Sequence, residues 1–148
     1  MGCYTRAVLR VVLDTSVIAS AFRSQAGASF AILRAVRFRR VIPLATTGLL
    51  LEYEDVLKRP EQREVSGLSL ADVDRVLGAL AVAIEPVDVH LRWRPQLRDT
   101  DDELVLEAAI NGRADALVTY NVRDFVSAAP RFGVRVLRPA DLLQELAT

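Results

Sequence analysis

The sequence predicts an α/β fold in which a central parallel sheet lies between two layers of helices, as a three-layer helix–sheet–helix sandwich. Short apolar runs of strand type alternate with segments of helical periodicity, which is the pattern of parallel βαβ units. Three of the predicted strands end in polar residues, at Asp14-Thr15-Ser16, Thr46-Thr47 and Thr119-Tyr120-Asn121. Ligands gather at the carboxyl ends of parallel strands, so we expect a functional site at this edge.

The first 60 residues predict two strands and three helices. The β-branched run over 8–13 is typical of a strand buried on both faces. Pro43 in the second strand indicates an edge position or a bulge, and Thr46 and Thr47 are candidate caps for the helix that stops by Pro60. The expected order is a strand over 8–13, a helix over 17–22, a helix from Gly27 to the basic run 37–40, a strand over 41–45 and a helix that carries Leu49 to Leu57.

The rest of the chain predicts three more helices and two more strands. Ser69 opens the clearest helix, with Asp72 at the capping-box position and Pro86 marking its end. The segment 87–95 is expected to be a loop or a short strand. The later elements are a helix from Asp99 to Ile110 closed by Asn111-Gly112, strands over 116–119 and 134–137, and a final helix from Pro139.

Composition limits the class of protein. The 148 residues fit one domain spanning 1–148, with 51% hydrophobic and 26% charged residues, as in ordinary globular proteins. No apolar run approaches the roughly 20 residues of a membrane span, and no secretory signal is recognisable. The single Cys3 cannot form an internal disulfide, which favours a cytoplasmic location. The one histidine, His90, is expected in a surface loop.

The charge balance is neutral, with 19 basic and 19 acidic residues. This balance argues against a protein that binds nucleic acid through bulk positive charge. It still allows a nuclease whose acidic residues are gathered in one metal-filled pocket.

Asp14 is the first candidate for such a pocket. It follows an unbroken apolar run, so its carboxylate should lie at the rim of the sheet. As an ordinary N-cap it would stabilise the helix that follows by about 1 kcal/mol. This structural role and a functional role are compatible.

Three aspartates crowd the start of a later helix, at positions 99, 101 and 102. The helix dipole favours acids in a first turn, but three of them repel each other unless a positive charge lies nearby. On a helix, Asp102 shares its face with Val105 and Leu106, the packed side, whereas Asp101 points away. Asp102 is therefore expected to point into the structure and Asp99 to cap the helix.

Two further acidic positions are left open by the pattern. Helical geometry does not separate Glu52 from Glu54, because each lies beyond one edge of the same apolar stripe. Asp124 follows a polar strand end and serves either as a loop cap or as a site acid. If these acids converge, an oxygen-only cluster favours Mg²⁺ or Mn²⁺. With one histidine and one cysteine in the chain, a zinc site is poorly supported.

Four segments in order resemble the PIN-domain nucleases. The family's opening strand, which ends in an aspartate, resembles VVLDTSVIASAF. Its second acidic motif, in which the glutamate before the aromatic is the metal-site acid, resembles LLLEYEDVLKRP. Its third and fourth motifs resemble RDTDDELVLEAAINGRADALVTYNVRDF, and its last strand and helix resemble GVRVLRPADLL. The resemblance spans residues 8–143 and is closest to the branch of toxins from toxin–antitoxin systems.

The resemblance implies metal-dependent hydrolysis of phosphodiester bonds in single-stranded RNA, with Mg²⁺ or Mn²⁺ as cofactor. It selects Glu52 over Glu54. The implied metal-binding and catalytic acids are Asp14, Glu52, Asp102 and Asp124. The implied supporting residues are Ser16, Thr119, Asn121 and Asp99. The implied partners are an RNA substrate, an antitoxin protein and a second copy of the chain in a homodimer.

Two positions depart from the family pattern. Ser16 stands where the family often has Asn, although Ser keeps the hydrogen-bonding role. Asn121 stands where many relatives have Asp, so either Asn121 or Asp124 completes the site, and the number of metal ions stays open. The alternative function is a catalytically weak or inactive PIN-fold module that binds RNA or a protein partner.

Two other enzyme classes with an aspartate or a turn after the first strand do not match this sequence. A phosphatase of the haloacid dehalogenase type needs a second aspartate where Ser16 stands, and a dinucleotide-binding domain needs a Gly-rich turn after the first strand. Neither feature is present. Four arginines are candidates either for phosphate contact or for solvated helix ends, namely Arg23, Arg37, Arg39 and Arg40.

Overall fold

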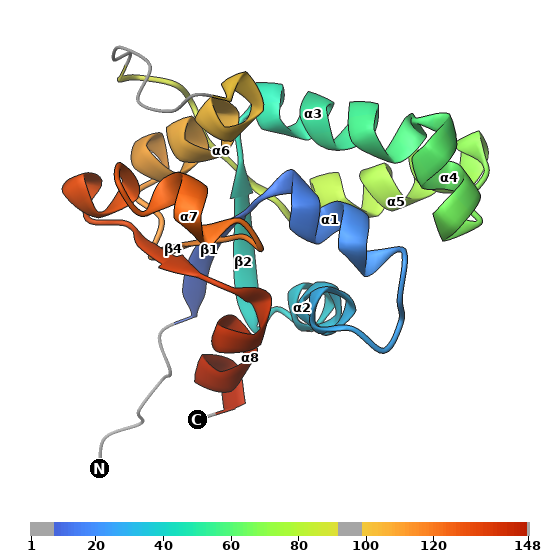
Figure 1. The fold of residues 1–148 in the computed structure, drawn as a ribbon, viewed down its shortest axis with the longest axis horizontal. Coiled ribbons are helices and arrows are strands. Elements are labelled where there is room, and N and C mark those ends of the chain that lie inside the picture. The colour runs from blue at the N-terminus through green and yellow to red at the C-terminus, as the bar shows by residue number, and fades with distance from the viewer. Residues whose placement is uncertain (1–7, 92–98, 148) are drawn as a thin grey trace.

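The computed structural model describes residues 8–91 and 99–147 (Figure 1). Cys3 and the end of the predicted 87–95 segment lie outside the described residues. The strands are β1 (Leu9–Leu13), β2 (Val41–Ala45), β3 (Glu85–Pro86), β4 (Ala116–Val118) and β5 (Arg135–Leu137). The helices are α1 (Thr15–Ala21), α2 (Ala28–Arg37), α3 (Thr47–Lys58), α4 (Pro60–Ser66), α5 (Leu70–Ala83), α6 (Thr100–Asn111), α7 (Val122–Phe125) and α8 (Pro139–Ala147), with a 3₁₀ helix η1 (Ala129–Phe132).

The five strands form one parallel sheet in the order β3-β2-β1-β4-β5. The central strand β1 pairs with β2 on one side and with β4 on the other, so that Leu13 lies beside Val118. All strands run in the same direction, and the polar residues that follow them meet at one edge. The predicted parallel α/β fold is confirmed.

Helices cover both faces of this sheet. The connection from β1 to β2 moves in one direction across the sheet and the connection from β3 to β4 moves back, so right-handed crossovers place their helices on opposite faces. In agreement, α2 packs against β2 and α8, while α6 packs against β1, β2 and β4. Helices α3 to α5 extend to one side of the sheet (Figure 1). Within the described residues, no helix is long and apolar enough to cross a membrane.

Side-chain caps fix several helix starts where the sequence predicts them. The Thr46 hydroxyl accepts the backbone N–H of Leu49 at the start of α3. Ser69 and Asp72 form both halves of the predicted capping box of α5. These caps satisfy N–H groups that have no partner inside the helix.

Other elements differ from the prediction. Pro60 does not only end α3, because it is also the first residue of α4, where its fixed φ and missing N–H suit a helix start. The short elements β3, α7 and η1 were not predicted. Pro43, expected at an edge position or a bulge, lies in β2, which has neighbours on both sides. Because β3 pairs only with Leu44 and Ala45, however, Pro43 itself lies before that pairing begins.

Gly112 ends α6 because of a close approach and not because of its backbone angles. Its φ is −83°, an ordinary value, and Arg113 is the residue with positive φ. A Cβ at position 112 would lie 2.9 Å from the carbonyl oxygen of Ala108 and 2.9 Å from a methyl carbon of Val87. The glycine therefore lets the end of α6 pack closely against the sheet.

A pair of glycine substitutions tests this packing. Gly112→Ala should lower the free energy of unfolding by about 1–3 kcal/mol, because the new methyl group overpacks the core. Gly78→Ala, in the exposed middle of α5 with open space around its Cα, should raise it by about 0.5–1 kcal/mol. Urea denaturation of both variants checks the prediction, and equal signs for the two changes would contradict it.

Candidate metal centre

Asp14 is buried at the carboxyl end of β1, with 5% of its surface exposed. Its side chain makes no capping bond to α1, so the expectation that it caps this helix through its carboxylate is wrong. Instead, Oδ2 accepts hydrogen bonds from the hydroxyls of Ser16 (2.9 Å) and Thr119 (2.6 Å). Among the described residues Oδ1 accepts no hydrogen bond, so this oxygen is left for another ligand.

Thr119 connects the ends of β1 and β4. It is fully buried, and its hydroxyl donates to Asp14 while it accepts the backbone N–H of Asn121 at 2.9 Å. The backbone N–H of Asp14 in turn donates to the carbonyl oxygen of Val118 at 2.9 Å. The orientation of the Asp14 carboxylate is therefore set by a strand that lies more than 100 residues away in the sequence.

Asp102 lies in the first turn of α6, which packs against β1. Partial burial is the largest cause that raises the pKa of its carboxyl to about 7, and the neighbouring charges of Asp14, Asp99, Asp124 and Asp101 supply the rest of the increase. Asp99 is the predicted cap of this helix, since its carboxylate accepts the backbone N–H of Asp101 at 2.8 Å. The structure therefore brings Asp14, Asp102 and Asp124 into one group of interacting charges.

Glu52 approaches the same edge from α3. The next residue, Tyr53, is buried, and its hydroxyl donates to the carbonyl oxygen of Leu13, which ties α3 to the end of β1. Burial is the largest cause that raises the pKa of Glu52, and the negative charges of Asp101 and Asp55 raise this pKa as well. Burial and the nearby Asp14 likewise raise the pKa of Tyr53. The sequence contained Tyr53 in the second motif but gave no sign of this bond.

The two glutamates of α3 have different surroundings. Glu54 forms an ion pair with Lys58 at 2.9 Å, whereas Glu52 has no ion pair with a described residue. The structure thus gives a reason to separate two residues that helical geometry left equivalent. Glu52 faces the acidic helix start at Asp99 and Asp101, and Glu54 belongs to an ordinary surface pair.

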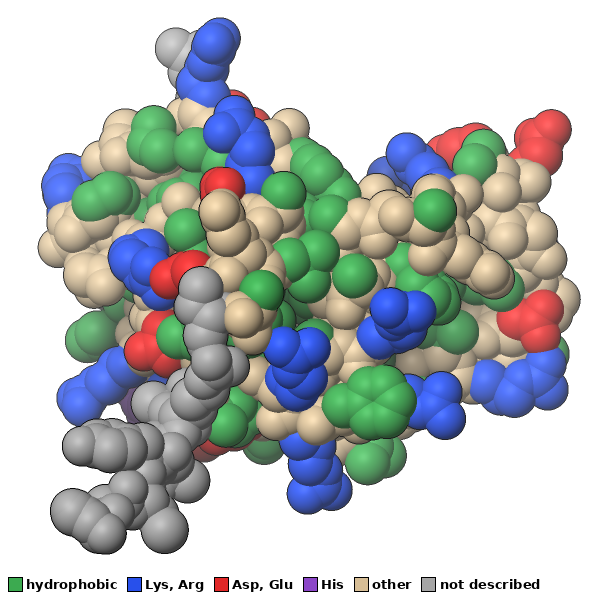
Figure 2. All heavy atoms as spheres, turned by 90° about the horizontal axis from the view of Figure 1, so that it is seen from below, with side chains coloured by type: hydrophobic (Ala, Val, Ile, Leu, Met, Phe, Trp, Pro, Cys, Tyr) green, Lys and Arg blue, Asp and Glu red, His purple; other side chains and the backbone are tan. Residues whose placement is uncertain are grey.

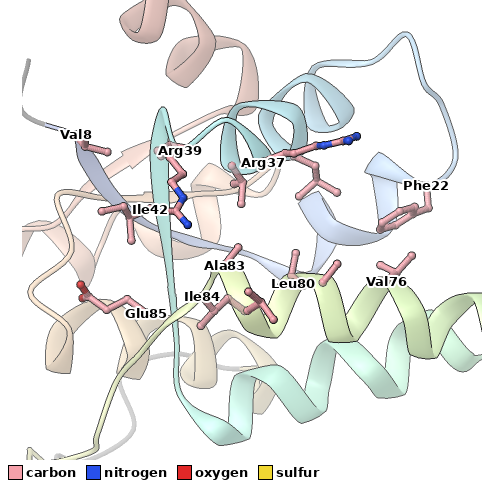
Figure 3. A pocket seen from close by; sticks show the side chains of 15 residues that line it. Val8, Phe22, Arg37, Arg39, Ile42, Val76, Leu80, Ala83, Ile84 and Glu85 are labelled. Carbon is pink, nitrogen blue, oxygen red and sulfur yellow. The ribbon is translucent and has the colours of Figure 1, made fainter.

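The candidate arginines do not surround the acids. Arg23 is bound to the buried Gln62 through two hydrogen bonds of 3.0 and 2.7 Å. Arg37 and Arg39 line an apolar groove of about 910 Å³ between the start of β2 and helix α5 (Figure 3). Arg40 donates to the backbone carbonyl of Leu146. Arg37, Arg39 and Arg40 therefore lie at the amino end of β2, away from the acids.

The two edges of the sheet differ in chemistry. Viewed from below, at the amino ends of β1 and β2, Lys and Arg side chains are spread among apolar side chains (Figure 2). At the carboxyl edge the described acids Asp14, Glu52, Asp102 and Asp124 have no ion pair with a described basic residue. His90 is exposed, as expected.

The family model for the PIN domain matches residues 10–123 of the chain. The chain belongs to the PIN-domain family. The matched segment contains Asp14, Glu52 and Asp102. A search of curated proteins found no match.

This PIN domain is also similar in structure to a chain of a solved protein–DNA complex. The solved structure is that of VapBC2 from Rickettsia felis, bound to a DNA fragment from the promoter of the pair. The likeness covers 88% of this chain and 98% of that chain, with a TM-score of 0.56 and 15% sequence identity. At this identity the likeness shows a shared fold.

The chemistry of the side chains in this PIN domain fits a hard divalent cation. The acids that raise the pKa of Asp102 offer only oxygen atoms, and Asp14 has a carboxylate oxygen without a described donor. Over residues 8–91 and 99–147, however, no three acidic, histidine or cysteine side chains lie close enough together to hold one ion. The acids form an electrostatic cluster whose side chains have to move closer together to share a cation.

Proposed function

We propose that this PIN domain is a metal-dependent endoribonuclease that hydrolyses phosphodiester bonds of single-stranded RNA. The observation that supports this most is the group of carboxylates from Asp14, Asp102 and Asp124, which influence each other at the carboxyl edge without a described basic partner. Such a group is unfavourable unless a cation neutralises it. PIN domains are typically nucleases that use divalent metals.

The residues proposed to hold Mg²⁺ or Mn²⁺ are Asp14, Glu52, Asp102 and Asp124. When bound, the metal lowers the pKa of a water molecule and neutralises charge on the phosphate. Ser16 and Thr119 act on Asp14, because their hydroxyls hold Oδ2 and direct the other oxygen to the metal side. Asp99 fixes the first turn of α6 and with it the position of Asp102. Asn121 supports Thr119 through its backbone N–H.

Single-stranded RNA is the proposed substrate class because a small open edge can reach unstacked bases and the backbone. An A-form duplex hides its base edges in a narrow major groove. We further propose that the chain is the toxin of a toxin–antitoxin pair in the cytoplasm, with an antitoxin protein as partner. The likeness to VapBC2 supports this proposal.

The test is cleavage of a labelled single-stranded RNA by the purified chain. We expect cleavage in the presence of Mg²⁺ or Mn²⁺ and none in EDTA, with activity returning when the metal is added again. RNA that stays intact under all these conditions, while it binds the protein, would instead support the alternative of an inactive RNA-binding PIN module. Two observations favour that alternative: the acids are not drawn together in a ready metal site, and Asn121 stands where many relatives have Asp.

The two glutamates of α3 provide a matched prediction. Glu52→Gln should lower the cleavage rate by about 10²-fold, because it removes a proposed metal ligand without a change in size. Glu54→Gln, two residues away, should leave the rate within about twofold, since it removes only a partly exposed ion pair with Lys58. Initial rates at saturating Mn²⁺ and RNA check this. A larger loss in Glu54→Gln than in Glu52→Gln would contradict the assignment.

Self-association is proposed as well. The sequence places four apolar residues along α2 and just after its end, namely Phe30, Leu33, Val36 and Phe38. Val36 is buried in the core and Leu33 lines the groove, whereas Phe38 is 69% exposed. A two-fold dimer would bury at least about 1,000 Å² in total. Light scattering at micromolar concentration should give twice the chain mass of 16.3 kDa, and the mass of a single chain would contradict the dimer.

A further inference from the structure

Tyr120 is an exposed aromatic residue next to the acid cluster. It follows β4 directly, between Thr119, which holds Asp14, and Asn121, whose backbone N–H donates to Thr119. Its side chain is 41% exposed. Two other aromatic side chains near this edge, Tyr53 on α3 and Phe125 on α7, are buried.

The position of the Tyr120 ring is fixed at both ends. Its backbone lies between two hydrogen-bonded groups: the backbone N–H of Thr119 donates to the carbonyl oxygen of Leu137, and the backbone N–H of Asn121 donates to the hydroxyl of Thr119. At the far end, its hydroxyl lies 2.6 Å from the hydroxyl of Ser29, which is 1% exposed at the start of α2. The ring therefore spans from β4 to α2 and has little freedom to turn away from the edge. A fixed aromatic ring loses little conformational entropy when a second ring stacks on it.

The carboxylates of the acid cluster offer a nucleotide base no flat surface on which to stack. Carboxylates and a metal act on the phosphate, and Arg37, Arg39 and Arg40 lie at the amino end of β2. Proteins that bind single-stranded nucleic acid commonly hold unstacked bases on aromatic side chains. Tyr120 has the required properties at this edge: exposure, rigidity and direct sequence proximity to a residue that contacts Asp14.

We propose that Tyr120 is a stacking platform for a base of single-stranded RNA whose phosphate lies at the acid cluster. The inference rests on the proposed ribonuclease function and deepens it by naming a substrate contact outside the acidic residues. Tyr120 would then contribute to affinity and to the preference for unpaired RNA, with no part in bond cleavage. The competing role is structural, in which the Tyr120–Ser29 contact only fastens α2 to β4.

Substitutions at position 120 separate these two roles. Tyr120→Leu removes the aromatic ring, Tyr120→Phe keeps the ring and removes the hydroxyl, and Tyr120→Trp enlarges the ring. Ser29→Ala removes the hydroxyl partner of Tyr120 and leaves the ring in place. Phe132→Leu is the matched control, because Phe132 is also exposed but lies in η1 before β5, at the amino edge of the sheet.

The probe is a set of short single-stranded RNAs that carry the fluorescent base 2-aminopurine at successive positions. Each RNA is titrated with the protein in a buffer that contains Ca²⁺ in place of Mg²⁺, to prevent cleavage. Stacking of the base on an aromatic ring quenches its fluorescence. The wild type should quench one position strongly, and Tyr120→Leu should lose this quenching and bind roughly tenfold more weakly. Tyr120→Phe and Tyr120→Trp should retain the quenching, and Phe132→Leu should behave as the wild type.

Each other outcome counts against the inference. Equal quenching and affinity in Tyr120→Leu and the wild type would overturn it, while cleavage by the wild type would leave the proposed function intact. If a folded wild type neither binds nor cleaves RNA, the proposed function itself fails. If Tyr120→Leu does not fold, Tyr120→Trp decides: loss of quenching in that variant overturns the stacking role. If Ser29→Ala and Tyr120→Phe lower the melting temperature equally but every variant binds RNA as the wild type does, the contact is structural.

Discussion

In the Asp14→Asn variant, cleavage of single-stranded RNA is expected to fall at least about a thousandfold, which corresponds to about 4 kcal/mol of lost transition-state stabilisation. Asn keeps one oxygen that can accept the hydrogen bonds of Ser16 and Thr119, but it removes the negative charge that would hold a cation. Calorimetric titration should therefore also show loss of Mn²⁺ binding. The thermal stability should change little, because the change relieves repulsion in the acid cluster.

Asp115→Asn is the control for this experiment. Asp115 precedes β4 at the opposite edge of the sheet, where its carboxylate accepts the backbone N–H of Arg10 at 2.8 Å. This variant should cleave RNA at the rate of the wild type. Cleavage that survives in Asp14→Asn would point to a contaminating nuclease, and equal Mn²⁺ binding by Asp14→Asn and the wild type would exclude Asp14 as a ligand.

The affinity for Mn²⁺ is expected to fall about tenfold from pH 8 to pH 6. The pKa of Asp102 is raised to about 7, by burial first and by the neighbouring carboxylates second. Its carboxyl is therefore about nine-tenths ionised at pH 8 and about one-tenth ionised at pH 6, so protons compete with the metal. Titrations at pH 6, 7 and 8 check this, with Glu54→Gln as a control that keeps the same profile. A flat profile would contradict the role of Asp102.

The same pKa affects the stability of the metal-free protein, with the opposite sign from a salt-bridged carboxylate. The pKa of Asp102 is about 7 in the folded chain and near 4 in the unfolded chain, so the folded state holds its proton more tightly. The resulting stability is present at acidic pH and is lost as the pH rises through about 7. Because Asp102 is only partly buried, solvent screening leaves about 1–2 kcal/mol of this effect. Asp102→Asn should accordingly raise the melting temperature at pH 8, without metal, and change it little at pH 4.

Much of the fold could be predicted from the sequence because the apolar runs are short and the helix starts are marked. The polar residues after β1 and β4 could be assigned to one edge, since a parallel sheet leaves no other choice. The family resemblance implied Ser16 and Thr119 as supporting residues, but the strand and helix pattern alone could not assign Thr119 to Asp14, because the pairing of β1 with β4 is decided by packing over the whole chain. The capping expectation for Asp14 failed for the same reason: two hydroxyls, one of them from β4, replace the helix N–H groups.

Other parts of the site were out of reach of the sequence for local reasons. Glu52 and Glu54 differ only in their neighbours, and Lys58 pairs with one of them. The basic run that ends in Arg40 could not be assigned to an edge until the path of α2 was known. Pro60 follows the end of α3 and is also the first residue of α4, so the sequence pattern indicated the end of one helix but not the start of the next. The buried Gln62 of α4, which binds Arg23, was therefore not predicted either. The two-residue strand β3 is too short to leave a pattern.

The hydrogen bond from Thr119 to Asp14 also bears on the order in which this PIN domain assembles during synthesis. The two residues are 105 positions apart, and ribosomes add about 5–20 residues per second. For roughly 5–20 seconds, a nascent chain therefore contains Asp14 but not yet Thr119, whose hydroxyl orients the Asp14 carboxylate. The segment carrying Asp102, Thr119 and Asp124 emerges late, so the acid cluster assembles only when most of the chain has left the ribosome. Under the proposed function, the messenger RNA being translated would not meet an assembled acid cluster until synthesis is nearly complete.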